Sequence, residues 1–199
     1  MNLNKFALPS SALCTIALVS AVAVGFSQDK PAKAEQGKAV NAAAPKLAPQ
    51  HTQLKKMVGN WDATVTCTMP GKPAATSTGK AEYKAVGDTW VESDFSGEMD
   101  GVKFTGHGID GFDTAENKYV SIWVDSMSTE LHKFEGTGDA SGATTTRTGE
   151  CKDPETGKMV KQRSVTEMKD NDSMTFRMFT TGPDGKEVEA MKIDYKRRK

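Results

Sequence analysis

The sequence is poor in the residues that build metal and redox sites. Its 199 residues include only three cysteines and three histidines. None of them stand at the spacing of a structural zinc site. The sequence also lacks net charge, because 26 lysines and arginines balance 26 aspartates and glutamates, so it has no general attraction for nucleic acid or anionic membranes. We therefore expect no metal, no cofactor and no nucleic-acid partner.

Long apolar runs are absent except near the N-terminus, where an uncharged stretch over residues 12–26 follows Lys5. A basic residue followed by a short apolar run is typical of a secretory signal peptide, and this run is shorter than the ~20 residues that span a membrane. Cleavage after Ser27 or Ala34 suits the small-residue rule. We favour the former, so residues 1–27 are the expected signal peptide. Retention of this segment as an uncleaved anchor is the alternative.

Export implies a periplasmic or secreted protein, without stable membrane insertion once the signal is removed. Residues 28–50 have almost no large apolar side chains and are rich in Ala, Lys, Pro and Gln. Such a segment cannot offset its ordering entropy, so we expect a disordered linker. In residues 51–58 the apolar positions recur at helical spacing, which predicts a short helix ended by Gly59. The folded domain is therefore expected over residues 51–199.

Helical periodicity is absent from Trp61 onward, where apolar and polar residues alternate with a period of two. This pattern predicts ten short strands joined by compact turns, that is, an all-β antiparallel up-and-down meander. Ten strands in an open sheet would expose two long edges, so closure into a barrel is favoured. On four strands the expected inner face is clear: Trp61, Ala63, Val65; Ala81, Tyr83; Met174, Phe176, Met178; and Met191, Ile193, Tyr195.

The middle strands leave two interpretations open, because aromatic residues there alternate with ionisable ones. A ligand cavity needs apolar walls and a few polar groups, which favours an inner wall made of the aromatic and ionisable faces. Alternatively these faces point outward, and Val91, Val120, Ile122 and Val124 line the interior. On the first interpretation the ligand is a small apolar or aromatic molecule with a polar end. Its candidate ligand-binding residues are Trp90, Glu92, Phe104, Trp123, Asp125 and His132.

Two other functions are compatible with the sequence. One is a protein-interaction module tethered by the flexible linker. The other is an enzyme that uses Glu92, Asp125 and His132. A domain this rich in acidic residues offers such carboxylates by chance, and no serine lies in a Gly-x-Ser-x-Gly motif. We therefore assign no catalytic residue, and the sequence predicts no oligomeric state.

The disulfide question depends on two cysteines, because Cys14 lies within the signal. An oxidising compartment would favour a bridge between Cys67 and Cys151. However, they end strands that lie four steps apart around a ring roughly 15 Å wide, whereas a disulfide requires Cα atoms within about 7 Å. We therefore expect two separate thiols.

Two sets of residues resemble known families. Gly59-Asn60-Trp61 is similar to the Gly-x-Trp motif of lipocalins and other calycin barrels. That resemblance implies a tryptophan packed across the closed end of the barrel, beneath a basic side chain from the last strand, which Arg197 or Arg198 would supply.

The longer run His51–Lys196 resembles a bacterial family, domain of unknown function 1579, which forms calycin-like barrels. The resemblance implies a calycin-like fold and carries over no established activity. Cys151 departs from the pattern, since a non-cysteine residue is expected there. The matching segments are Leu54–Trp61, Gly79–Tyr83, Trp123–Ser128, Gly149–Glu150, Asp153–Lys158 and Thr181–Lys186.

Overall fold

The computed structural model describes residues 45–199 except 70, 100, 154–156 and 183–184. The expected signal peptide (1–27) and most of the expected linker (28–50) lie outside the described residues. The described chain forms one helix and ten strands: α1 (Pro49–Lys55), β1 (Gly59–Cys67), β2 (Ala75–Val86), β3 (Trp90–Met99), β4 (Val102–Asp113), β5 (Lys118–Asp125), β6 (His132–Gly138), β7 (Thr144–Lys152), β8 (Met159–Asp170), β9 (Ser173–Thr181) and β10 (Glu187–Arg197).

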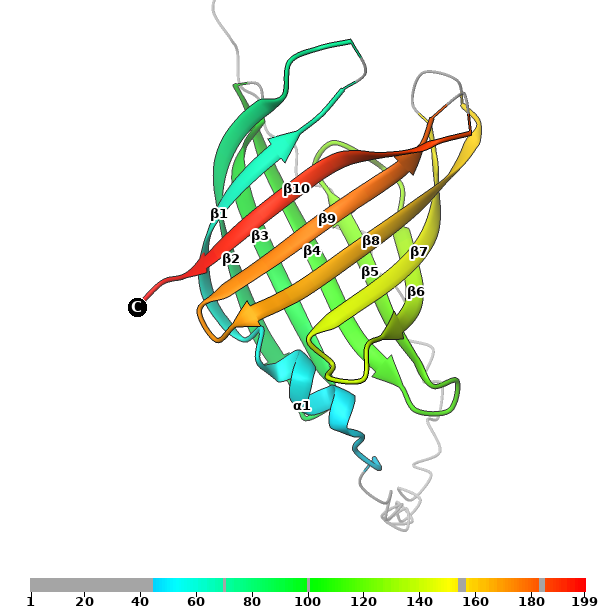
Figure 1. Ribbon diagram of the computed structural model, residues 1–199. Coiled ribbons are helices and arrows are strands. Elements are labelled where there is room, and N and C mark those ends of the chain that lie inside the picture. Colours follow the sequence, from blue (N-terminus) through cyan, green and yellow to red (C-terminus); the bar gives the residue numbers. More distant parts are fainter. Residues whose placement is uncertain (1–44, 70, 100, 154–156, 183–184) are drawn as a thin grey trace, which may run out of the picture. The chain divides into compact units, whose positions relative to one another are not determined.

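The ten strands close into one antiparallel barrel (Figure 1), which confirms the predicted fold. Each strand pairs with its sequence neighbours, and β1 pairs with β10 from Trp61↔Arg197 to Cys67↔Met191. This last pairing removes both sheet edges, which would otherwise present unpaired backbone groups. Every strand therefore has one face toward the interior of the barrel and one toward its outside.

The barrel has two different ends. We call the end where β1 begins at Gly59 the closed end, because α1 lies there and buries His51, Leu54 and the following Met57 (Figure 1). The opposite end, where β1 finishes at Cys67, we call the open end. The helix begins at Pro49, two residues before the expected start, because proline suits the first turn of a helix.

The core lies in the half of the barrel next to the closed end. Trp61, Val91 and Met174 are at most 1% exposed there. The inner faces predicted for the first two and last two strands are confirmed by this cluster: its members include Trp61, Ala63, Val65, Ala81, Tyr83, Met174, Ile193 and Tyr195, with Phe176 and Met191 packed against it.

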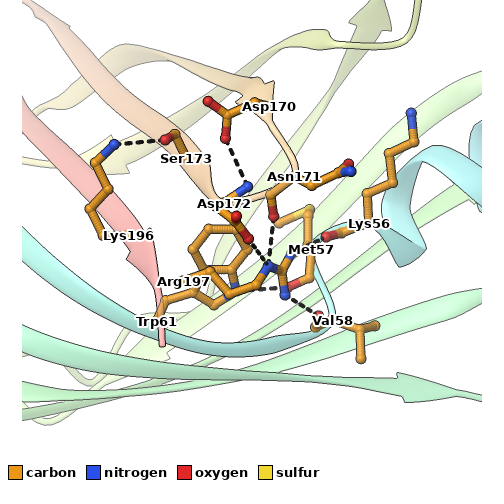
Figure 2. Close-up of polar contacts among 10 residues, drawn as sticks. All are labelled: Lys56, Met57, Val58, Trp61, Asp170, Asn171, Asp172, Ser173, Lys196 and Arg197. Carbon is orange, nitrogen blue, oxygen red and sulfur yellow. Dashed lines mark hydrogen bonds and ion pairs between the residues drawn. The ribbon is translucent and has the colours of Figure 1, made fainter. Parts of the chain in front are cut away.

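Arg197 holds the closed end together through Trp61 (Figure 2). Its guanidinium carbon lies 4.1 Å from the centre of the Trp61 ring, and the indole Nε1 donates to the Met57 carbonyl at 2.8 Å. The guanidinium also donates to three backbone carbonyls at 2.6–2.7 Å, those of Lys56, Val58 and Asn171. Of the two arginines expected for this role, Arg197 is therefore the one that fills it.

Gly59 makes this arrangement sterically possible. Its φ of 135° lies in a region that side-chain-bearing residues rarely adopt, and a Cβ there would collide with the Arg197 guanidinium. The glycine of the Gly-x-Trp motif therefore leaves space for the arginine that covers the tryptophan.

Indole rings pack against glycines of β4 on both faces of the sheet. A Cβ at Gly106 or Gly108 would meet the Trp123 ring inside the barrel, whereas a Cβ at Gly111 would meet the Trp90 ring outside. The Gly106-His107-Gly108 segment is therefore a place where a strand accommodates a bulky cross-strand neighbour.

Cys67 is half-buried and Cys151 is buried. They lie on β1 and β7, which are four strand steps apart in the barrel, and they are not bridged to each other. Within the described residues, none of the helices has the length and apolar character needed to cross a membrane.

Candidate ligand-binding interior

Four of the predicted ligand-binding residues lie together on the inner wall of the open end. Phe104, Trp123, Asp125 and His132 come from the adjacent strands β4, β5 and β6, and Trp123 is paired directly with His132. All four are half-buried. Phe104 and Trp123 also pack against the edge of the core. On these strands the structure therefore places aromatic and ionisable side chains inside the barrel.

The expectation for Trp90 and Glu92 is corrected, because both lie on the outer face. On β3 the buried positions are Val91, Ser93 and Phe95, and strand alternation puts the residues between them outside. Trp90 remains 39% exposed. The alternative, in which the valine and isoleucine faces line the interior, holds for Val91 on β3. It is wrong for β5, where Ile122 and Val124 are 39% and 40% exposed on the outer face.

Hydrogen bonds orient Trp123 and Asp125 on the inner wall of the open end, which we call the open-end wall. The Trp123 indole Nε1 donates to Asp125 Oδ2 at 2.9 Å, and the Met127 backbone N–H donates to Asp125 Oδ1 at 2.9 Å. The carboxylate is thereby fixed between its own strand and the following turn. The indole lies over Gly106 and Gly108, with its polar edge tied to the carboxylate.

The carboxylates and histidine of the enzyme hypothesis do not come together. Glu92 lies on the outer face, opposite the interior positions of Asp125 and His132, so the three side chains cannot act on one substrate. Among the described residues, no group of His, Cys, Asp and Glu side chains has a geometry that could hold a metal ion.

Sequence reasoning missed a buried ion pair in the interior. Arg147 Nη2 lies 3.1 Å from Asp110 Oδ1, and the two side chains are 4% and 15% exposed. Burial raises the pKa of the Asp110 carboxyl, and the Arg147 charge opposes this shift. Arg147 stands in a threonine-rich segment whose alternation does not reveal which face is buried, so the sequence carried no clear signal for it.

Three tyrosines surround this pair on the closed-end side. Tyr83 and Tyr195 hydrogen-bond to each other, and burial raises the pKa of Tyr195 to about 12 and that of Tyr83 well above its usual range. The Arg147 guanidinium lies 5.6 Å from the centre of the Tyr119 ring. Tyr83 and Tyr195 were expected on the inner face, and strand alternation puts Tyr119 on the same face of β5 as Trp123.

Two polar groups of this cluster have no hydrogen-bond partner within the described part of the chain: the Tyr119 hydroxyl and Arg147 Nε. Tyr119 also lines a cleft of about 240 Å³, which we call the helix-end cleft. It lies between α1 and the β6–β7 turn, and its lining includes Gln53, Asn117, Asp139 and Gly142. The closed end of the barrel is therefore hollowed beside the helix.

Comparison with solved structures supports the barrel fold. The structure of Rv2717c from M. tuberculosis aligns with a TM-score of 0.57 and 13% sequence identity, over 77% of this chain and all of that one. An S-type phycobiliprotein lyase, CPES from Guillardia theta, aligns with a TM-score of 0.49 and 11% identity, over 73% of this chain and 90% of that one. At 13% identity, the similarity to Rv2717c shows the fold alone.

A search of curated proteins finds no match to the sequence. The family described as "Protein of unknown function (DUF1579)" matches residues 46–197, which include the helix and all ten strands. The chain, whose described part forms a β-barrel, therefore belongs to the DUF1579 family.

Proposed function

We propose that the barrel binds a small apolar or aromatic molecule with a polar end at its open end. The observation that carries the proposal is a difference in burial along one continuous inner wall. Side chains pointing into the barrel are buried near α1, whereas Phe104, Trp123 and Met178 stay half-exposed toward the open end. Large apolar side chains that face inward without being covered are typical of a ligand site.

The chemistry of this wall sets the ligand class. Phe104, Trp123 and Met178 offer aromatic and thioether surface to an apolar body. His132 and Asp125 supply polar groups on the same wall, and each oxygen of the Asp125 carboxylate accepts one hydrogen bond, from the Trp123 indole and from the Met127 backbone. A ligand with a flat apolar body and one polar end satisfies both parts.

Fluorescence titration with the neutral apolar dye N-phenyl-1-naphthylamine tests the proposal. The chain has three tryptophans, which lie at the closed end (Trp61), on the outer face (Trp90) and in the proposed site (Trp123). We expect saturable binding that weakens at least tenfold in Trp123→Ala, because aromatic contact area is lost. The matched control Trp90→Ala should bind the dye as the parent does. Absence of saturable binding, or binding that survives Trp123→Ala, would reject the open-end site.

We also propose that the protein is exported, on the strength of the basic residue and apolar run at its N-terminus. Intact mass of protein recovered from the periplasm or medium tests this. A mature chain beginning at Gln28 is expected, and a full-length chain confined to the cytoplasm would contradict export.

A further inference from the structure

The helix-end cleft has the features of a second binding site, separate from the open end. A smaller cavity of about 20 Å³ lies beneath it, and Gln53, Tyr119 and Gly142 line both. The smaller cavity reaches Arg147. The two spaces therefore adjoin each other along the Tyr119 ring, and the buried Arg147 side chain lines the smaller one.

Tyr119 and Arg147, which both line the smaller cavity, each leave one buried polar atom without a partner in the described chain. Tyr119 is 2% exposed and Arg147 is 3% exposed. Yet the Tyr119 hydroxyl and Arg147 Nε make no hydrogen bond to any described residue. Buried polar groups are nearly always paired, and an arginine Nε can only donate. The missing partner must therefore present an acceptor atom.

The charges around the cleft indicate that this acceptor belongs to a neutral molecule. Asp110 already neutralises Arg147 at 3.1 Å. Asp139 lines the cleft, and the Ser141 hydroxyl, 2.7 Å from its Oδ1, helps to hold the pKa of Asp139 below its usual range. An anion would meet the negative charges of both aspartates, and a cation would bring its charge toward Arg147 without offering an acceptor.

The volume of the cleft limits the size of the molecule. A cavity of ~150 Å³ accepts benzene, and sites for drug-sized ligands begin at ~300 Å³. The helix-end cleft, at about 240 Å³, lies between these values. Gln53 and Asn117 at its sides add amide groups that can bind further polar atoms of a ligand.

We propose that the helix-end cleft binds a small, neutral, carbonyl-bearing molecule of about single-ring size, whose oxygen accepts hydrogen bonds from the Tyr119 hydroxyl and Arg147 Nε. This site uses no residue of the open-end wall. The two sites can therefore be tested independently, and either can fail without the other.

Three probes of equal size and different polarity test the proposal: benzamide, benzoate and toluene, titrated into ¹⁵N-labelled full-length protein and followed by NMR. Benzamide should shift the backbone signals of Gln53, Tyr119 and Gly142 in a saturable manner. Benzoate and toluene should bind at least tenfold more weakly, because one adds a charge and the other lacks an acceptor. The Trp123 indole N–H signal reports binding at the open end separately.

The variant Tyr119→Phe keeps the ring and removes the unpartnered hydroxyl. It should fold with an unchanged or higher Tm and bind benzamide about three- to tenfold more weakly, which corresponds to one net hydrogen bond. Trp90→Phe, on the outer face, is the matched control and should bind as the parent does. Three results would overturn the proposal: no saturable shift at the cleft, which would leave only a bound water there; tighter binding of benzoate; or unchanged affinity in Tyr119→Phe.

Discussion

The two ends of the barrel are made from the same ten strands but differ in how their inner faces are covered. At the closed end α1, Trp61 and Arg197 exclude solvent from the interior. At the open end Phe104 and Trp123, which also point inward, remain half-exposed. Burial of apolar surface stabilises a fold by ~25 cal/mol per Å², so the closed end carries most of the stability. The open end is correspondingly free to exchange solvent for a ligand.

Replacing one tryptophan at each end is the most direct test of this difference. Trp61→Ala should lower the free energy of unfolding by ~3–5 kcal/mol, because it empties a fully buried site and removes the ring beneath Arg197. Trp123→Ala, at a half-exposed site, should cost only ~1–2 kcal/mol. Urea denaturation of both variants measures the two losses. Equal losses would mean that the open end is packed as tightly as the closed end.

The Asp110–Arg147 pair extends the comparison of buried and exposed sites from apolar to charged side chains. Asp110→Ala leaves a buried guanidinium without its counter-charge. It should lower the free energy of unfolding by ~3 kcal/mol, the lower end of the range for a broken buried ion pair. The lower end applies because burial already raises the pKa of Asp110, so its ionised form is costly in the parent.

The control for this variant is an ion pair on the outside of the barrel. Arg163 lies 2.5 Å from Glu187, with side chains 31% and 44% exposed. Glu187→Ala should therefore cost at most ~1 kcal/mol. Denaturant unfolding at pH 7 compares the two variants, and a loss for Asp110→Ala no greater than that for Glu187→Ala would refute the role assigned to the buried pair.

The closed-end tyrosines predict how the protein responds to alkali. The pKa of Tyr195 is about 12 in the folded state, against an ordinary value of 10.0. Because the folded-state pKa is raised, the contribution of Tyr195 to stability is complete below pH 10 and is lost as the pH rises through 12. The loss is on the order of 2–3 kcal/mol.

Absorbance of phenolate at 295 nm, recorded together with circular dichroism, measures this response. Ionisation of Tyr195 should coincide with unfolding, and Tyr195→Phe should retain more of its neutral-pH stability above pH 10. Titration of Tyr83 and Tyr195 near pH 10 in the folded protein would show that the closed end admits water.

The sequence predicted the barrel well, for a physical reason. Alternation with a period of two is directly visible where one face of a strand is apolar and the other is polar, as on β1 from Trp61 to Cys67. Such alternation is encoded by neighbouring residues and can be read without the fold. The covering arginine was implied only by the resemblance to the Gly-x-Trp motif, which left Arg197 and Arg198 as candidates, and the structure supplies its steric reason at Gly59.

The functional residues were less predictable, because both faces of the middle strands carry apolar side chains. Trp90 was assigned to the interior together with Trp123, yet the two indoles lie on opposite faces of the sheet, each over a glycine of β4. The Asp110–Arg147 pair joins residues from β4 and β7, which are not neighbours in the barrel. No local pattern can indicate a contact of that kind.

The last prediction concerns the thiols near the open end, Cys67 and Cys151. Four strand steps separate β1 from β7, which is more than the ~7 Å between Cα atoms that a disulfide allows. We expect two reactive thiols per chain when the unreduced mature protein is titrated in denaturant. In the native protein Cys151 should react slowly, because burial and the nearby Glu130 and Asp153 charges raise the pKa of its thiol. If denatured, unreduced protein shows no thiol and runs as a monomer without reductant, the open end must flatten enough to bring β1 and β7 together. The open end could not then keep the arrangement of strands on which the proposed ligand site rests.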